Sequence, residues 1–167
     1  MSYASLTSIQ DNLKTLLEAE ATPPGDPTWV PIFHGGLVPV ITQEKGNITK
    51  AVQGALQKVG AGVIIFVPAI TFPNNLTHQI LLALRIAIGV TTNPIILAQR
   101  LDFPFHAIDI VTRIIYLVHG KPNGVSPKNH VRKSLFTIDR EAAQMDTAGV
   151  PAGLDNYIVN VNTEIHL

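Results

Sequence analysis

The longest run of apolar residues lies near the middle of the chain and extends from Ile80 to Val90, with Arg85 as its only charge. Both sets of alternating positions in this run are largely apolar, which is typical of a strand covered on both faces. The run ends at Thr91–Pro94, because proline has no N–H and restricts the residue before it. The pattern therefore predicts a central strand followed by a crossing loop.

After Pro104 the spacing of the apolar residues changes to that of a helix. The apolar stripe consists of Ala107, Ile108, Ile110, Val111, Ile114, Ile115, Leu117 and Val118. The residues that fall outside this stripe are Asp109, Thr112, Arg113 and Tyr116. Gly120, followed by Pro122, ends the pattern. We therefore predict one buried helix in this segment.

The other elements are predicted from shorter patterns. One face of an N-terminal helix carries Leu6, Ile9, Leu13, Leu16 and Leu17. Asn47 or Thr49 can cap a second helix, and a strand over residues 62–72 follows it. Residues 135–138 predict a short strand and residues 141–146 one helical turn. Residues 156–167 alternate like a half-exposed strand near a sheet edge or an oligomer interface.

The segment from residue 21 to residue 46 is rich in proline and glycine. Because proline is excluded from central strands, this segment is expected to be an extended arm, an edge hairpin or a loop. Its apolar side chains are Trp29, Val30, Ile32, Phe33, Leu37, Val38, Val40 and Ile41. This content is too apolar for a solvated linker, so we expect the arm to pack on its own domain or on a neighbouring subunit.

The order of these elements predicts a single α/β (α+β) domain over residues 1–167, with a mixed central β-sheet flanked by helices. Its parts are an N-terminal helix (1–20), the arm (21–46), a helix-strand-strand-helix core (47–120) and C-terminal strands (121–167). A chain of this length and 46% hydrophobic content can bury one sizeable core.

The charge balance narrows the range of partners. Twelve basic and twelve acidic residues give a net charge of zero, which argues against direct nucleic-acid recognition by a basic surface. With only 14% charged residues, the chain is poorly suited to an isolated monomer, so we expect self-association. We expect no signal peptide and no membrane span, and we expect the protein to be made in a cytoplasm.

The sequence provides little support for an active site. His34-Gly35-Gly36 is similar to an oxyanion loop, but the chain has no Gly-x-Ser-x-Gly motif to accompany it. The six histidines lack the spacing of metal ligands, and the chain contains no cysteine. We therefore predict no catalytic residue, no metal site and no cofactor.

Three charged residues need an explanation of their own. Arg85 lies inside the predicted central strand, where a buried guanidinium needs a partner. Asp102 and Asp109 are candidates for that structural ion pair, and a carboxylate of a neighbouring subunit is a further possibility. His106 and Asp109 could also meet at a spacing of three residues, but a first-turn histidine with a solvent-facing aspartate is the favoured interpretation.

Three segments together resemble the tail terminator (tail completion) proteins of long-tailed bacteriophages. The first is the strand LRIAIGVTTNPII with its Asn-Pro break, and the second is the helix AIDIVTRIIYLVHG. The third is the final strand, NYIVNVNTEIHL. The resemblance covers residues 81–120 well and the last strand fairly, and the arm matches poorly.

The resemblance implies a small α/β domain that assembles as a hexameric ring on the tail tube of a virion. Such a ring stops tube polymerisation and joins the tube to the head-tail connector, so its partners are itself, the tail tube protein and the connector protein. Rings need two different complementary faces. The candidate interface residues are Trp29, Ile32, Phe33, Leu37, Val38, Tyr157, Val159 and Val161.

Two alternatives remain open at this stage. The chain could be another neck protein, a head-closure protein or a baseplate protein, which assembles only on a portal-type ring. It could also be a small enzyme or ligand-binding domain that uses the loop from Asn93 to His106 at the end of the central strand. In that case Asp102 and His106 would be required for the activity.

Overall fold

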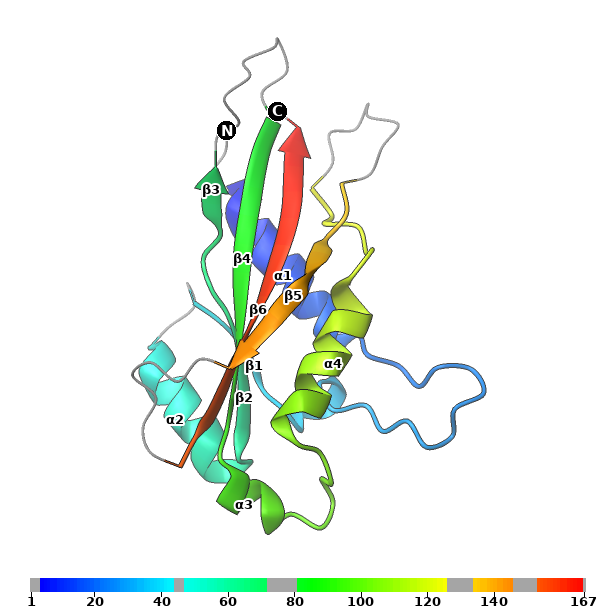
Figure 1. Ribbon diagram of the computed structural model, residues 1–167, viewed down its shortest axis with the longest axis vertical. Coiled ribbons are helices and arrows are strands. Elements are labelled where there is room, and N and C mark those ends of the chain that lie inside the picture. Colours follow the sequence, from blue (N-terminus) through cyan, green and yellow to red (C-terminus); the bar gives the residue numbers. More distant parts are fainter. Residues whose placement is uncertain (1–3, 44–46, 72–80, 126–133, 146–152, 167) are drawn as a thin grey trace.

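The computed structural model describes residues 4–43, 47–71, 81–125, 134–145 and 153–166 of the chain. They form a single α/β domain in which four helices pack against a six-stranded mixed sheet (Figure 1). The elements are, in chain order, α1 (Ala4–Glu18), η1 (His34–Gly36), β1 (Val40–Thr42), α2 (Ile48–Lys58), β2 (Ala61–Ile65), β3 (Ala69–Thr71), β4 (Leu81–Thr92), α3 (Pro94–Ala98), α4 (Ala107–Val118), β5 (Thr137–Met145) and β6 (Asp155–His166).

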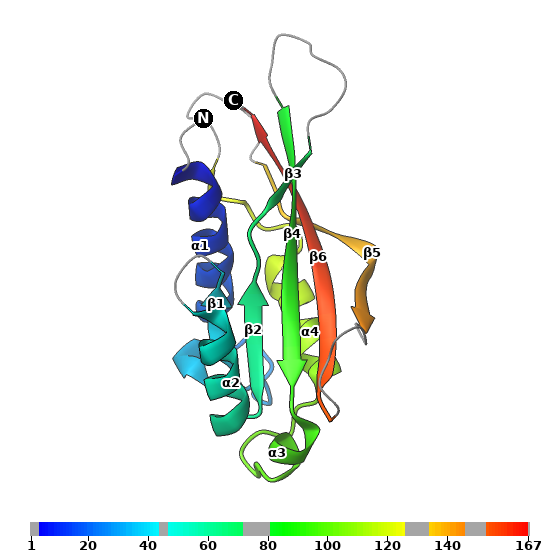
Figure 2. The same ribbon diagram turned by 90° about the vertical axis from the view of Figure 1, so that its left-hand side faces the viewer.

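The sheet is built around β4, as the apolar run predicted. Its strand order is β1-β2-β4-β6-β5, and β3 also pairs with β4. The β4 and β6 strands are antiparallel over their whole length, from Leu81 opposite His166 to Thr92 opposite Asp155. The β2 and β3 strands follow one another along the same edge of β4 (Figure 2). Only β1 and β2 are parallel, so the sheet is mixed.

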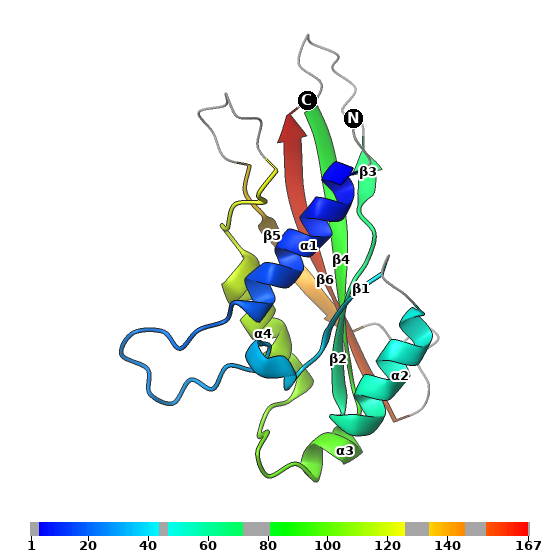
Figure 3. The same ribbon diagram turned by 180° about the vertical axis from the view of Figure 1, so that it is seen from behind.

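One face of the sheet forms the core. The buried apolar residues that its two long strands contribute are Leu84, Ile86, Ile88, Val90, Val159, Val161 and Ile165. They belong to the same cluster as apolar residues of α1 and α4, and Figure 3 shows α1 lying across this part of the sheet. Both helices are confirmed, and so is the burial of Ile9, Leu13 and Leu17 in α1 and of Ile110, Val111, Ile114 and Val118 in α4. The predicted stripe of α4 is wrong at two positions, since Ile108 is exposed and Arg113 is buried. The burial of Leu6 lies outside what the structure describes.

The other face of β4 is buried over only part of the strand. The prediction that β4 is covered on both faces is therefore wrong for the part around Arg85. Arg85 is exposed and Ala87 is half-buried on this face. Farther along β4, Gly89 is buried on the same face, where an added Cβ would lie 3.1 Å from Cε2 of Phe66. Helix α2 packs on the neighbouring strand β2, where a Cβ added to Gly62 would lie 3.4 Å from the Cβ of Ala55. This face of β4 is therefore covered near Gly89 and open near Arg85.

Two further sequence predictions need correction. Residues 141–145 belong to β5 and not to a helical turn, and residues 143–145 pair with β6. The prediction that the final strand is half-exposed and near a sheet edge is confirmed, since β6 lies next to the edge strand β5 and its buried positions alternate with more exposed ones. The strand predicted over residues 62–72 is two strands, β2 and β3, with Pro68 in the connection between them.

The described part of the arm, residues 21–43, contains the turn η1 and the short edge strand β1, and its other residues are irregular. An edge hairpin was one of its predicted forms, but β1 pairs in parallel with β2 and therefore forms no hairpin with it. Val38 and Val40 are buried in the core. The arm thus packs on its own domain.

Asn93 should stabilise the short helix α3, which was not predicted from the sequence. Its Oδ1 atom accepts hydrogen bonds from the backbone N–H groups of Ile95 and Ile96, at 3.1 and 3.3 Å. We expect Asn93→Ala to lower the free energy of unfolding by about 1 kcal/mol, as loss of an N-cap usually does. Chemical denaturation measures this change. Asn93→Asp keeps the acceptor and is the control, and an unchanged midpoint for Asn93→Ala would contradict the assignment.

Candidate functional site

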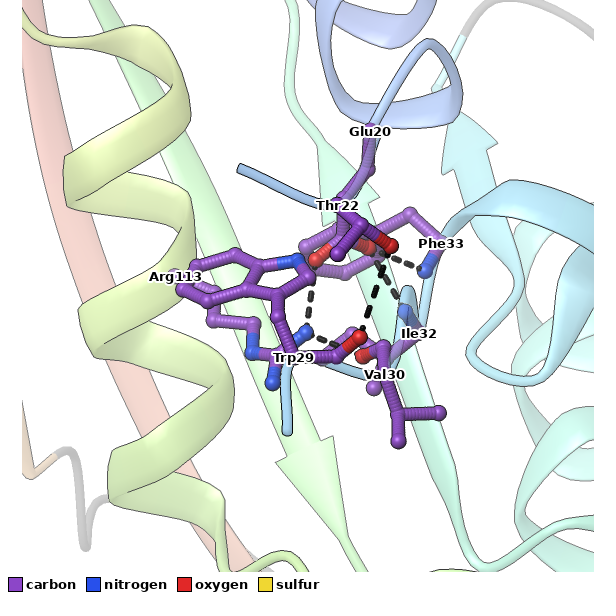
Figure 4. Close-up of polar contacts among 7 residues, drawn as sticks. All are labelled: Glu20, Thr22, Trp29, Val30, Ile32, Phe33 and Arg113. Atoms are coloured by element: carbon purple, nitrogen blue, oxygen red, sulfur yellow. Dashed lines mark hydrogen bonds and ion pairs between the residues drawn. The ribbon is translucent and has the colours of Figure 1, made fainter. Parts of the chain in front are cut away.

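A buried ion pair joins the start of the arm to helix α4. Glu20 follows α1, and Arg113 lies on the second turn of α4. The Nη1 atom of Arg113 lies 2.7 Å from Oε1 of Glu20, and the exposed fractions of the two side chains are 10% and 0% (Figure 4). A pair so deeply buried is tolerated only when its remaining polar atoms are also bonded.

The backbone of the arm supplies those bonds. Oε2 of Glu20 accepts hydrogen bonds from the backbone N–H groups of Ile32, at 2.6 Å, and Phe33, at 2.9 Å. The guanidinium of Arg113 also donates to the carbonyl oxygen of Val30 (Figure 4). The ion pair therefore fixes the path of residues 30–33 against α4.

Aromatic rings cover the guanidinium of Arg113. Its Cζ atom lies 4.0 Å from the ring centroid of Trp29 and 4.8 Å from that of Phe105. The ring of Trp29 in turn lies 5.5 Å from that of Tyr116. Arginine is suited to this position because its planar guanidinium stacks on aromatic faces while it forms an ion pair. A hollow of about 280 Å³ opens between these residues, with Thr112 on its wall.

The solvent side of α4 carries apolar residues next to this hollow. Ile108, Thr112 and Tyr116 follow one another at intervals of four residues, so they share one face of the helix. All three are exposed, Tyr116 by 60% of its surface. Val30 is also exposed, but on the arm, where its side chain points away from α4 (Figure 4). We call the surface of Ile108, Thr112 and Tyr116 the α4 outer surface.

A second group of exposed apolar residues lies on the β2–β3 side of the molecule. Val67 is 41% exposed and Ile70 is 40% exposed. The two surfaces lie on opposite sides of the domain, because β3 is at the left and α4 at the right in Figure 1, and Figure 2 shows β3 in front with α4 behind. We call the surface of Val67 and Ile70 the β3 surface.

A larger hollow, of about 480 Å³, lies where β4 ends and β6 begins. Its lining includes Thr92, Leu97, Arg100, Phe103, Phe105, His106 and Asp155. This is the place at which the ligand-binding alternative expected a site, in the loop from Asn93 to His106. Asp102 does not line it, because its carboxylate binds Arg100 on the exposed side of the loop.

The structure separates the eight candidate interface residues into two groups. Ile32, Phe33, Val38, Val159 and Val161 are buried in the core of their own domain. Their assignment to a subunit interface is wrong, because a partner could reach these side chains only if the core opened. Trp29, Leu37 and Tyr157 are half-buried and retain some accessible surface.

The predicted ion pair of Arg85 with Asp102 or Asp109 is also wrong. Arg85 is exposed, and its Nε atom donates to Oδ1 of Asn160 at 3.3 Å. Asp102 binds Arg100, whose hydrogen bonds lower the pKa of the Asp102 carboxyl below its ordinary value. Asp109 accepts a hydrogen bond from the backbone N–H of His106, at 2.8 Å, at the start of α4.

Among the described residues, one other carboxyl group has a pKa shifted from its ordinary value. The hydroxyl and the backbone N–H of Thr28 donate to Oδ1 of Asp26, at 2.6 and 3.0 Å. These bonds favour the ionised form and lower the pKa of Asp26. The contact lies within an exposed turn of the arm, so it shapes the turn and supplies no acid or base.

Sequence reasoning missed the Glu20–Arg113 pair, which carries the most buried charge described in the chain. The two residues are 93 positions apart, and no local pattern connects them. One signal was present, since Arg113 follows Ile110 by three positions and therefore lies at the border of the apolar stripe of α4. A charged residue at such a border suggests a buried partner.

Within the described part of the chain, no group of three or more His, Cys, Asp or Glu side chains is placed to hold a metal ion. Among the same residues, no helix has the length and apolar character needed to cross a membrane. Comparison of the chain with known protein families and with curated proteins finds no match.

Proposed function

We propose that this protein is a structural assembly protein, a tail terminator that forms a ring, caps a phage tail tube and joins it to the head-tail connector. The observation that carries the proposal is the presence of two exposed apolar surfaces on opposite sides of one domain, the α4 outer surface and the β3 surface. The small α/β domain with a mixed sheet is also the fold that the sequence resemblance implies.

Two different surfaces on opposite sides suit head-to-tail contact between copies. When the α4 outer surface of one copy meets the β3 surface of the next, the contact is heterologous, and repetition closes a ring if the rotation allows it. Tyr116 can supply a large, rigid contact at low cost in side-chain entropy. The half-buried Trp29 beside it makes this side of the domain more apolar still.

The mass of the purified chain tests the proposal. We expect light scattering and negative-stain images of the same fraction to show a closed ring of hexameric mass. We expect tail tubes mixed with that fraction to carry capped ends. A chain that stays monomeric and leaves tube ends uncapped would contradict the proposal.

Single charges at the two surfaces test the proposed contact. We expect Tyr116→Glu and Val67→Glu each to reduce the ring to monomers at micromolar concentration, because each would bury an unpaired carboxylate in the interface. Gln57→Glu, on the exposed side of α2, is the matched control and should leave the ring intact. Circular dichroism should show the same fold in all three variants. A ring that survives both surface charges would exclude this contact.

A second neck-protein function makes a different prediction. A head-closure protein would remain a monomer alone and would assemble only on a portal-type ring. The two variants at the α4 outer surface and the β3 surface would then leave the isolated chain unchanged. Mixing the chain separately with tubes and with portal-type rings distinguishes these functions.

A further inference from the structure

The hollow at the end of β4 has two polar side chains at its sheet side. Thr92 is the last residue of β4 and Asp155 is the first residue of β6, and they are directly opposed in the antiparallel pairing. Opposed residues project to the same face of a sheet, so the two side chains are neighbours. Both line the hollow.

Both groups are without a bonding partner among the residues that the structure describes. Thr92 is 1% exposed, and its Oγ1 atom is buried with no hydrogen bond. The described residues likewise provide no hydrogen bond or ion pair for the half-buried carboxylate of Asp155. Buried polar groups in native proteins are nearly always bonded, so an unbonded hydroxyl in the wall of a hollow indicates a missing partner.

The one guanidinium at the hollow is already bound elsewhere. Arg100 donates from Nε and Nη2 to the carboxylate of Asp102, at 3.3 and 3.2 Å, and from Nη1 to the carbonyl of Val59, at 3.0 Å. The His106 side chain is exposed. Asp155 therefore remains the unneutralised charge in the lining, and it favours a cation.

The other walls of the hollow are apolar. Leu97 and Phe103 are buried, and the rings of Phe103 and Phe105 pack edge to face with centroids 4.9 Å apart. Aromatic faces attract cations and also pack well against alkyl chains. The volume of about 480 Å³ lies within the usual range of small-molecule sites.

We propose that this hollow binds an organic cation with a short apolar stem, either a primary ammonium or a guanidinium group. The charged head lies at Asp155 and donates to the hydroxyl of Thr92, while the stem lies against Leu97, Phe103 and Phe105. The cation is either a free amine or a basic side chain of a partner protein. This site does not depend on ring assembly, and it stands or falls on its own experiment.

The test is a titration of the full chain followed by ¹H–¹⁵N NMR at low ionic strength, with n-butylammonium chloride as the probe. We expect amide shifts confined to residues 92–107 and 155. Asp155→Asn should weaken binding about tenfold or more, because it removes the charge, and Thr92→Val about threefold, because it keeps the shape and removes the hydroxyl. Asp26→Asn, which neutralises an exposed carboxylate of the arm, should leave the affinity unchanged.

n-Butanol has a similar stem without the charge, and it should bind at least tenfold more weakly than n-butylammonium. If n-butanol and n-butylammonium bind equally tightly, or if Asp155→Asn does not change the affinity, the hollow does not recognise the positive charge. Either result would overturn the proposal. A capped Gly-Lys-Gly peptide separates the two sources of the cation. Tighter binding of the peptide assigns the site to a partner's side chain, and binding of the free amine alone assigns it to a small molecule.

Discussion

Replacing Arg113 by methionine is expected to lower the free energy of unfolding by about 3–5 kcal/mol, the cost of breaking a buried ion pair from one side. The carboxylate of Glu20 would remain fully buried at the end of α1, and its charge would lose the only cation that an ion pair within the described chain gives it. Methionine keeps most of the stem that packs beneath Trp29, so lost packing contributes little. Equilibrium denaturation in urea measures the change.

A second ion pair on the same molecule provides the matched control. Lys14 and Glu18 lie one turn apart on α1, with 3.6 Å between their charged atoms, and their side chains are 35% and 47% exposed. Lys14→Met should cost less than about 1 kcal/mol, because exposed pairs contribute little to stability. Similar losses for Arg113→Met and Lys14→Met would contradict the burial-based argument.

The double variant Glu20→Gln/Arg113→Met separates the ion pair from the packing. Glutamine can still accept from the N–H groups of Ile32 and Phe33 through its amide oxygen, and it carries no charge. We expect the double variant to be more stable than Arg113→Met alone. If it is less stable, the bonds of Glu20 to the arm matter more than its charge.

The fold was predictable where one local period determined which side chains are buried. Helices α1 and α4 and the cap at Asn47 each depend on residues within a few positions of one another, and the structure confirms all three, although Ile108 of α4 is exposed. The pairing of strands that are far apart in the chain was harder to predict. Residues 141–145 have a composition suited to a helix, but they belong to β5, and residues 143–145 pair with β6.

The candidate sites were only partly predictable, for a related physical reason. The apolar side chains of the arm indicated that it must be buried, but not whether against its own domain or against another subunit. In the structure, Ile32 and Phe33 are part of the core of their own domain. The buried carboxylate of Glu20 explains this choice, since it binds the N–H groups of both residues. The sequence suggests the loop after β4 as the position of a ligand site in the alternative function. The position of Thr92 beside Asp155 depends on the register of β4 and β6, which the sequence does not give.

Replacing Phe33 by alanine is expected to lower the free energy of unfolding by about 3–5 kcal/mol, because it leaves a cavity in the core. Phe33 is 1% exposed and belongs to the main core cluster, and its backbone is fixed by Glu20, so neighbouring chain cannot easily move in to fill the space. Val30→Ala, in the same arm but at an exposed position, should cost less than about 0.5 kcal/mol. Urea denaturation and light scattering of both variants distinguish a core position from an interface position.

If Phe33→Ala dissociated a ring while leaving the unfolding of the single chain unchanged, Phe33 would belong to the interface after all. The opposite outcome, a destabilised chain that still forms rings, assigns the arm to the domain and leaves assembly to α4 and β3.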